Sequence, residues 1–189
     1  MIGQLALFKP KGKRLRNRIE ITPITVAQAR YTLENLHYLK RCRTGRQINY
    51  AVLIDGIVDG VITYAYPLMS AGLCDVPADE LLEFSRLYLK SNIPHSASCA
   101  VGRSLRCIVL DWAVKFPDAK PIRLIVSWSD TTRHQGTIYK AANFQWLKIS
   151  KGAAEGENGI RYRPDGRKRR LILHPDRKNP KDCWIYKPR

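Results

Sequence analysis

Acidic residues and long hydrophobic runs are both scarce in this sequence. Only 16 of the 189 residues are Asp or Glu, against 33 Lys or Arg, which gives a formal net charge of +17. No apolar run approaches the roughly 20 residues that span a bilayer. Residues 1–8 are too short for a secretory signal and have no small-residue cleavage site. We therefore expect a cytoplasmic protein without a membrane partner.

Cysteines are few, and their spacing is not that of a disulfide-linked or zinc-binding module. The five cysteines are odd in number and include no C-x-x-C pair. A disulfide scaffold and a structural zinc site are therefore not expected. The hydrophobic content of 44% is enough to build a core, which excludes general disorder.

The positive charge is concentrated at the two ends of the chain. Residues 1–18 contribute +6 and residues 161–189 contribute +8 of the +17, so the middle of the chain is almost balanced. A distribution this uneven favours a nucleic-acid partner over a merely solvated surface. Membrane-surface binding is the weaker alternative, because neither end has the pattern of an amphipathic helix with a bulky apolar face.

Hydrophobic periodicity predicts alternating helices and strands. Thr25 and Gln28 form a T-x-x-Q capping box ahead of an apolar stripe that begins at Ala29. Short β-branched and aromatic runs flank the Asp-Gly pair at 55–56, which predicts a hairpin. The predicted helices run from 25 to about 37–39, from 96 to 115 and from 134 to 143. The predicted strands are 50–54, 58–64, 81–89, 122–128, 145–150, 171–174 and 183–186.

This order of elements indicates an α/β domain in which helices cover a mixed sheet. We assign the domain to residues 25–150. A basic N-terminal segment, 1–24, precedes it. A basic C-terminal segment, 151–189, follows it and is expected to pack on the sheet or extend it.

Three segments carry residues that suit chemistry better than packing. Arg86 lies inside an apolar strand, where a period of two places it on one face with Leu82, Phe84 and Tyr88. A buried guanidinium needs a partner, so it either forms an ion pair with Glu83 or Asp130 or clamps an anion. The second segment, 92–98, begins a helix with hydroxyl residues, which suits an anion site or simple capping. The third, 127–144, is rich in hydrogen-bonding side chains at the end of a buried strand, where open α/β sheets bind ligands.

The last part of this third segment resembles a known fold. Residues 139–144, YKAANF, resemble the Y-x-x-x-G-F signature of the GCN5-related N-acyltransferases, with Asn143 in place of Gly. Asn also accepts the left-handed conformation required there. The resemblance implies a mixed, splayed central sheet flanked by helices. The Gly-rich loop that receives coenzyme A in that family is absent, since residues 92–100 contain no glycine, which argues against an ordinary acetyl-CoA-type ligand.

A narrower resemblance covers roughly residues 25–148. The runs EFSRLY at 83–88, VSWSD at 126–130 and GTIYKA at 136–141, with His37-Tyr38 upstream, resemble the Mom-type DNA modification proteins of bacteriophages. This resemblance implies conversion of adenine in duplex DNA to N6-(carbamoylmethyl)adenine, which protects phage DNA from host restriction. It also implies a small-molecule donor of unknown identity and an iron requirement.

The resemblance assigns roles to individual side chains. Tyr139 is expected at the mouth of the cleft as general acid or orienting hydroxyl, unless it is a core tyrosine. Asp130 is expected to contact the adenine amino group or act as base, or else to cap the short helix. Arg86 would hold the donor, with Ser96 and Ser98 near its anionic part. His37 is the lowest-ranked candidate, as a base or metal ligand.

The expected partner is duplex DNA, whose target base must be flipped out of the helix to be reached. The candidates for stacking on that base are Trp128, Tyr88 and Trp146. A second copy of the chain is a further candidate partner. Two other functions stay open: an N-acyltransferase acting on a protein amine, and a DNA-binding protein without catalysis. The predicted phosphate contacts are Lys11, Lys13, Arg14, Arg16, Arg18, Lys40, Arg41, Arg43, Arg46, Arg167, Lys168, Arg169 and Arg170.

Overall fold

The fold was analysed in a computed structural model, which describes residues 14–67, 72–150 and 179–188 and the backbone of 160–162 and 168–170. In chain order the elements are η1 (Leu15–Asn17), β1 (Ile19–Ile24), α1 (Val26–Leu36), β2 (Gln47–Ile54), β3 (Ile57–Ala65), η2 (Ala78–Glu80), β4 (Leu81–Leu89), α2 (Ser96–Lys115), β5 (Leu124–Asp130), α3 (Thr137–Ala141), β6 (Gln145–Ser150), β7 (Ile160–Tyr162), β8 (Lys168–Arg170) and β9 (Lys181–Tyr186).

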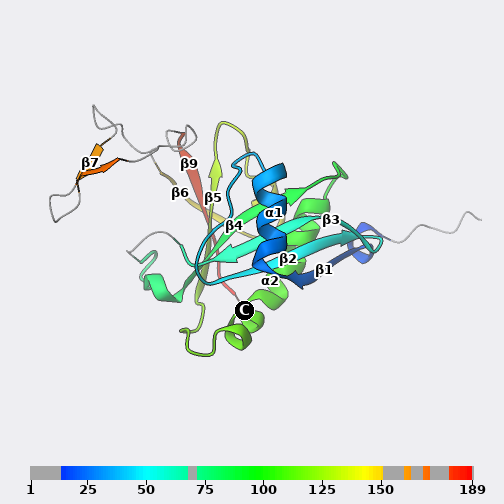
Figure 1. The fold of residues 1–189 in the computed structure, drawn as a ribbon, viewed down its shortest axis with the longest axis horizontal. Coiled ribbons are helices and arrows are strands. Elements are labelled where there is room, and N and C mark those ends of the chain that lie inside the picture. The colour runs from blue at the N-terminus through cyan, green and yellow to red at the C-terminus, as the bar shows by residue number, and fades with distance from the viewer. Residues whose placement is uncertain (1–13, 68–71, 151–159, 163–167, 171–178, 189) are drawn as a thin grey trace, which may run out of the picture.

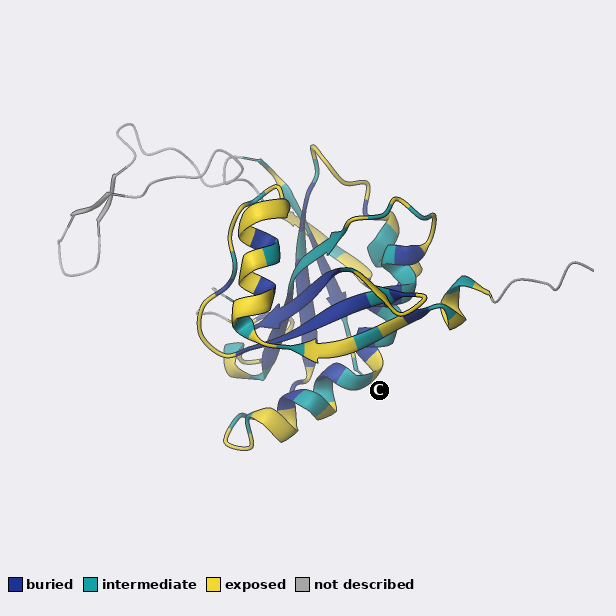
Figure 2. Ribbon diagram, turned by 45° about the vertical axis from the view of Figure 1, so that its right-hand side comes forward, coloured by how far each residue is buried: buried dark blue, intermediate teal, exposed yellow. Residues whose placement is uncertain are grey.

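A seven-stranded mixed sheet in the order β1-β2-β3-β4-β5-β9-β6 forms the centre of the molecule, and β7 and β8 pair separately. Among the described strands, β4 and β5 are the one pair that runs parallel. The helices α1 and α2 cover opposite faces of the sheet (Figure 1). Buried residues are concentrated in the central strands, whereas α1 exposes most of its outer surface (Figure 2). The predicted α/β class with a splayed sheet and flanking helices is confirmed.

Local sequence signals explain several boundaries. The capping box at the start of α1 is present, with the Thr25 side chain accepting from the Gln28 N–H. The hairpin between β2 and β3 turns through Asp55 (φ 53°) and Gly56 (φ 79°). Two consecutive left-handed residues are what a two-residue hairpin loop of type I′ requires. Asn143 also adopts a positive φ of 64° after α3, as predicted from its exchange with Gly.

The β4 strand contains a bulge that the sequence pattern did not reveal. Its pairing with β3 shifts between Thr63 and Tyr64, which face Arg86 and Phe84 respectively, so Ser85 has no partner in the ladder. The prediction that Arg86 and Phe84 share a face is therefore wrong. Phe84 packs in the core beside α2, together with Leu87 and Leu89 beyond the bulge. Arg86 points to the opposite face, which α1 covers.

Beyond this bulge, β4 and β5 separate. Their parallel pairing is confined to residues 81–83 of β4 and 124–126 of β5. Both strands continue after this pairing ends, β4 to Leu89 and β5 to Asp130. The separation opens the centre of the sheet at one end.

The two ends of the chain contribute more to the sheet than the sequence indicated. Residues 19–24, assigned above to a basic segment outside the domain, form the edge strand β1 and pair with β2. The C-terminal segment supplies β9, which lies between β5 and β6. The short helix α3 is half the predicted length, because Gly136 turns the chain just before it. The strand predicted at 171–174 lies outside the described residues. None of the helices in the described part of the chain is long and apolar enough to cross a membrane.

Candidate active site

A cleft of about 1130 Å³ lies where β4 and β5 separate. Its walls come from the end of α1 and the loop after it, from the outer half of β4, and from the segment between β5 and α3. Of the predicted catalytic residues, the cleft brings together His37, Arg86 and Tyr139. These three side chains come from three elements that are distant in the sequence.

Tyr139 connects the cleft to both separated strands. Its hydroxyl lies 3.1 Å from Oγ of Ser127 on β5, and the same Oγ lies 2.9 Å from the carbonyl oxygen of Phe84 on β4. Ser127 has one hydroxyl hydrogen, so when it donates to Phe84, Tyr139 donates to Ser127. Burial raises the pKa of Tyr139 to about 12, against the weaker opposing effect of the Ser127 hydrogen bond. The phenol therefore keeps its proton at neutral pH.

The ring of Tyr139 is held by aromatic neighbours. It stacks on Trp184 of β9 with centroids 5.2 Å apart and planes 7° from parallel. The indole Nε1 of Trp184 in turn donates to Ser129 Oγ at 2.9 Å. Gly136 turns into α3 with φ +73° directly against the Trp184 ring. The C-terminal strand thus fixes the position of the candidate catalytic tyrosine.

Arg86 reaches the cleft and forms no salt bridge with an acidic residue of the described part of the chain. Its Nη1 donates to the carbonyl oxygen of the adjacent Ser85 at 2.5 Å, while its Nε is buried and makes no hydrogen bond within the described residues. Glu83, one of the two partners considered from the sequence, is bound at 2.9 Å by Arg43 instead. Burial lowers the pKa of Arg86 although the nearby charge of Glu83 raises it. The geometry favours the anion clamp over the structural ion pair.

Asp130 lies at the end of β5 but does not line the cleft. Its carboxylate accepts hydrogen bonds from the Thr132 N–H (3.0 Å), the Thr132 hydroxyl (2.6 Å) and Asn179 Nδ2 (2.8 Å). Burial would raise the pKa of Asp130, but these hydrogen bonds and the charge of Lys181 outweigh it and lower the pKa. The side chain caps the turn after β5 rather than α3, whose N-cap is Gly136.

His37 ends α1 and is buried at the edge of the cleft. Burial, followed by the charges of Arg86 and His134, lowers the pKa of His37 to about 4. The imidazole is therefore neutral at pH 7, and its Nδ1 accepts the Leu39 N–H at 3.1 Å. This bond assigns the proton to Nε2. In that tautomer His37 is a hydrogen-bond donor and not a base.

Ser96 and Ser98 are not among the residues that line the cleft. The Ser96 hydroxyl donates to the Ile93 carbonyl and the Ser98 hydroxyl to the His95 carbonyl. Both hydroxyl hydrogens are thus used within the turn that starts α2. The N-cap of α2 is His95, whose side chain makes no capping bond, and Ser96 is the first residue of the helix. Ser96 is therefore not the helix cap.

Tyr38 is the site residue that sequence reasoning left without a role. It is 41% exposed, stacks on His37 at 4.5 Å, and has the Arg133 guanidinium 4.9 Å from its ring centre. Of the predicted stacking residues, Tyr88 and Trp128 line the cleft, whereas Trp146 does not. The signal for Tyr38 was its place beside His37 at a helix end, next to a basic run.

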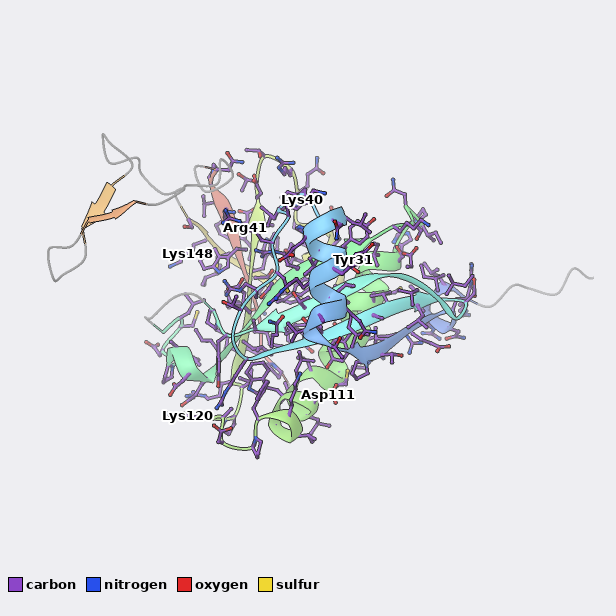
Figure 3. All side chains as sticks on the ribbon, viewed as in Figure 1. Tyr31, Lys40, Arg41, Asp111, Lys120 and Lys148 are labelled. Carbon is purple, nitrogen blue, oxygen red and sulfur yellow. The ribbon has the colours of Figure 1, made fainter. Side chains whose placement is uncertain are left out.

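The predicted phosphate contacts differ in exposure and in pairing. Lys40 and Arg41 lie next to each other beyond the end of α1, in the same half of Figure 3 as Lys148 and away from Lys120. Arg43 is buried against Glu83 and is not available to phosphate, which corrects that prediction. Arg18 and Arg46 form exposed ion pairs with Asp55 and Asp118, while Arg14 and Arg16 are exposed. Lys11, Lys13 and Arg167 lie outside the described residues, as do the side chains of Lys168, Arg169 and Arg170.

Comparison with known proteins identifies a family. A family model described as the Mom protein family matches residues 18–173. No curated protein matches the sequence significantly.

Three solved structures that resemble the chain are acetyltransferases. A Vibrio cholerae spermidine N-acetyltransferase chimera has a TM-score of 0.54 at 8% identity, covering 90% of this chain and 96% of that one. An N-acetyltransferase from Staphylococcus aureus Mu50 has a TM-score of 0.53 at 10% identity, covering 90% and 99%. The Salmonella typhimurium acetyltransferase that modifies the N-terminal serine of ribosomal protein L7/L12 has a TM-score of 0.53 at 11% identity, covering 92% and 97%. At such identities the likeness shows the fold alone, which is that of the GCN5-related N-acyltransferases.

Proposed function

The chain belongs to the Mom protein family, and on that premise we propose that it is a transferase that modifies adenine in duplex DNA to N6-(carbamoylmethyl)adenine, protecting phage DNA from host restriction. The observation that carries the proposal is the convergence of His37, Arg86 and Tyr139 in the cleft between β4 and β5. A neutral histidine that donates a hydrogen bond, a guanidinium cation and a protonated phenol are suited to bind the polar small molecule that supplies the transferred group. They are also suited to stabilise the leaving group.

The cleft has room for a base and a small donor together, since ligand pockets span roughly 300–1,000 Å³ and this one is about 1130 Å³. The adenine amino group is inaccessible to a transferase inside a duplex, so the base is flipped into the cleft. Tyr38 and Trp128 offer aromatic faces for it, and His37 Nε2–H offers a hydrogen bond to a ring nitrogen.

In the reaction, a bond forms between adenine N6 and the donor methylene carbon while the bond from that carbon to its leaving group breaks. One N6 proton is lost to solvent. Tyr139 turns its hydroxyl hydrogen from Ser127 to the leaving group, and its raised pKa keeps the phenol protonated for this hydrogen bond. Arg86 holds an oxyanion of the donor with its terminal nitrogens.

The described residues do not fit two groups that the resemblance raised. Among them, no three His, Cys, Asp or Glu side chains gather closely enough to hold a metal ion. The Ser96 and Ser98 hydroxyls bond within their own turn, and the segment before α2 contains no glycine to receive a pyrophosphate. We therefore assign the donor only as a small molecule bound through Arg86, and derive no step through iron or coenzyme A.

Duplex DNA is proposed to lie across the rim of the cleft. Lys40 and Arg41 beside the cleft, with the basic residues of the two chain ends, supply phosphate contacts that position the duplex without reading its sequence.

Expression in a bacterial host tests this function. Host DNA is digested to nucleosides and analysed by mass spectrometry, and we expect a deoxyadenosine carrying a carbamoylmethyl group. The matched control is Tyr139→Phe, which should leave host DNA largely unmodified. Unmodified deoxyadenosine from cells that contain folded wild-type protein would contradict the proposal. Tight binding of acetyl-CoA in calorimetry, without DNA modification, would favour the protein N-acyltransferase instead.

A further inference from the structure

Two buried polar side chains and the partly buried Arg86 form a row across the sheet beneath α1. Asn49 on β2 is the cross-strand partner of Thr63 on β3, and Thr63 is the cross-strand partner of Arg86 on β4. Asn49 is 1% exposed and Thr63 is fully buried. Within the described residues, no hydrogen bond is made by Asn49 Nδ2 or Oδ1, by Thr63 Oγ1 or by Arg86 Nε.

Such a row is unusual, because buried polar atoms are nearly always hydrogen-bonded. The unused atoms are also complementary. Arg86 Nε carries a donor, Thr63 Oγ1 both accepts and donates, and Asn49 Oδ1 accepts. Directly opposed residues of an antiparallel pair have Cβ atoms about 4.5–5.5 Å apart. Side-chain rotation alone can therefore make a relay from Arg86 Nε–H to Thr63 Oγ1, and from Thr63 O–H to Asn49 Oδ1.

Arg86 is the member of the row that reaches the cleft. Its Nη1 is held on the carbonyl oxygen of Ser85, the bulge residue beside it. In this rotamer the Nε–H does not bond to Thr63. Moving the guanidinium off that carbonyl is what would let Nε pair with Thr63 and turn both terminal nitrogens toward a ligand.

We propose that Thr63, supported by Asn49, is a positioning residue for Arg86 that acts when an oxyanion of the donor enters the cleft. The proposal rests on the role given to Arg86 in the function above. The oxyanion, a carboxylate or a phosphate, draws the two terminal nitrogens away from Ser85 into a bidentate contact. The relay through Thr63 and Asn49 then fixes the guanidinium plane, and the three complementary atoms become satisfied.

This role and a purely structural role predict different behaviour of Thr63→Val. The substitution keeps the shape and removes a hydroxyl that has no partner in the ligand-free protein. We expect a melting temperature equal to or above that of the wild type, while DNA modification falls by about tenfold or more, the scale of misplacing a positioning group. Thr63→Ser, which keeps the hydroxyl, should stay within about twofold of the wild type. Thr22→Val on the exposed edge of β1 is the matched control.

Full modification by Thr63→Val overturns the proposal. It is equally overturned if Thr63→Val and Thr63→Ser both lose activity in proportion to a lowered melting temperature, because that pattern is the one a structural hydroxyl produces.

A second measurement follows the Arg86 Nε–H directly by NMR, with acetate and inorganic phosphate as probes and Arg86→Lys to assign the signal. We expect one probe to shift this signal downfield in the wild type but not in Thr63→Val, and the effective probe identifies the oxyanion as carboxylate or phosphate. A shift that is the same in Thr63→Val, or no shift with either probe, overturns the relay. If the relay responds but wild-type protein leaves DNA unmodified, the proposed function fails and the relay stands.

Discussion

At the scale of single residues, the role of Tyr139 can be tested cleanly, because a substitution can remove its hydroxyl and keep its ring. The ring packs against Trp184 and Phe144, while the hydroxyl meets only Ser127 among the described residues. Tyr139→Phe should therefore change the melting temperature by no more than a few degrees. DNA modification should fall by about 10²-fold, the usual effect of losing a positioned acid. Nucleoside mass spectrometry and thermal unfolding measure the two effects.

Tyr31→Phe is the control for this substitution, since it removes the same hydroxyl from an exposed residue of α1 (Figure 3). It should leave both measurements unchanged. Unreduced modification in Tyr139→Phe would remove the phenol from the mechanism.

His37 gives the molecule a pH dependence with a definite sign. Burial lowers its pKa to about 4 in the folded state, below the ordinary value of 6.5. Between these two values the unfolded chain binds more protons than the folded one, so the free energy of unfolding falls as the pH is lowered through this range. Urea titrations from pH 7 to pH 4 should show this loss, and His37→Gln should reduce its slope.

His134 contributes in the same direction, because burial also lowers its pKa. His134→Gln is therefore the comparison that separates the two residues, and the double variant should have the smallest slope. A slope in His37→Gln equal to that of the wild type would mean that His37 is not titrating as a buried group.

At the scale of secondary-structure elements, the sequence predicts where helices and strands begin and end better than it predicts which face of a strand a side chain occupies. The bounds of β4, α2 and β6 agree with the prediction residue for residue, and Pro94 and Pro117 flank α2. The face on which Arg86 lies was predicted wrongly, because one bulged residue shifts a period-two pattern by one. The apolar positions 82, 84, 87 and 89 carry that shift and could have revealed it. The strand β1 was missed because its alternation directly follows a run of basic residues.

The turn before α3 has a geometry that suits glycine and little else. Gly136 has φ +73°, and a Cβ there would overlap the indole of Trp184. Gly136→Ala should therefore displace α3 from β9 and lower the melting temperature by several degrees. Activity should fall further than stability, since Tyr139 moves with the helix. Gly45→Ala is the control, because Gly45 also has a positive φ but open space around it. Equal effects of the two substitutions would show that backbone strain alone, and not the Trp184 contact, matters at residue 136.

At the scale of the whole molecule, the site depends on contacts that no local pattern encodes. Trp184 comes from the C-terminal segment and supports Tyr139 across 45 positions of sequence. The Arg43–Glu83 ion pair likewise joins the loop after α1 to β4 across 40 positions. The motifs led to the prediction that His37, Arg86 and Tyr139 gather, but the same reasoning wrongly included Asp130, Ser96 and Ser98, which do not line the cleft. The contact of Trp184 with Tyr139 follows only from the order of strands in the sheet, in which β9 lies beside β5.

The distribution of charge leads to the last prediction, on DNA binding. Residues 2–13 carry Lys9, Lys11 and Lys13 and no acid, whereas Arg18 binds Asp55 and β1 begins at Ile19. Deleting residues 2–13 therefore removes cations without removing a described contact of the fold, which a deletion through residue 18 would not achieve. Each phosphate contact adds about 0.9 to the slope of log K against log salt, so the slope should decrease by up to about 2.7.

Fluorescence anisotropy with one duplex at several salt concentrations measures this slope. Affinity should fall several-fold at low salt and much less at high salt, because screened contacts contribute little there. Lys120→Ala removes a cation from the lower part of the view in Figure 3, away from Lys40 and Arg41, and should leave the slope unchanged. A truncated protein that binds DNA with the full wild-type slope would mean that the N-terminal cations do not contact phosphate. The footprint on DNA would then be confined to the rim of the cleft and the C-terminal segment.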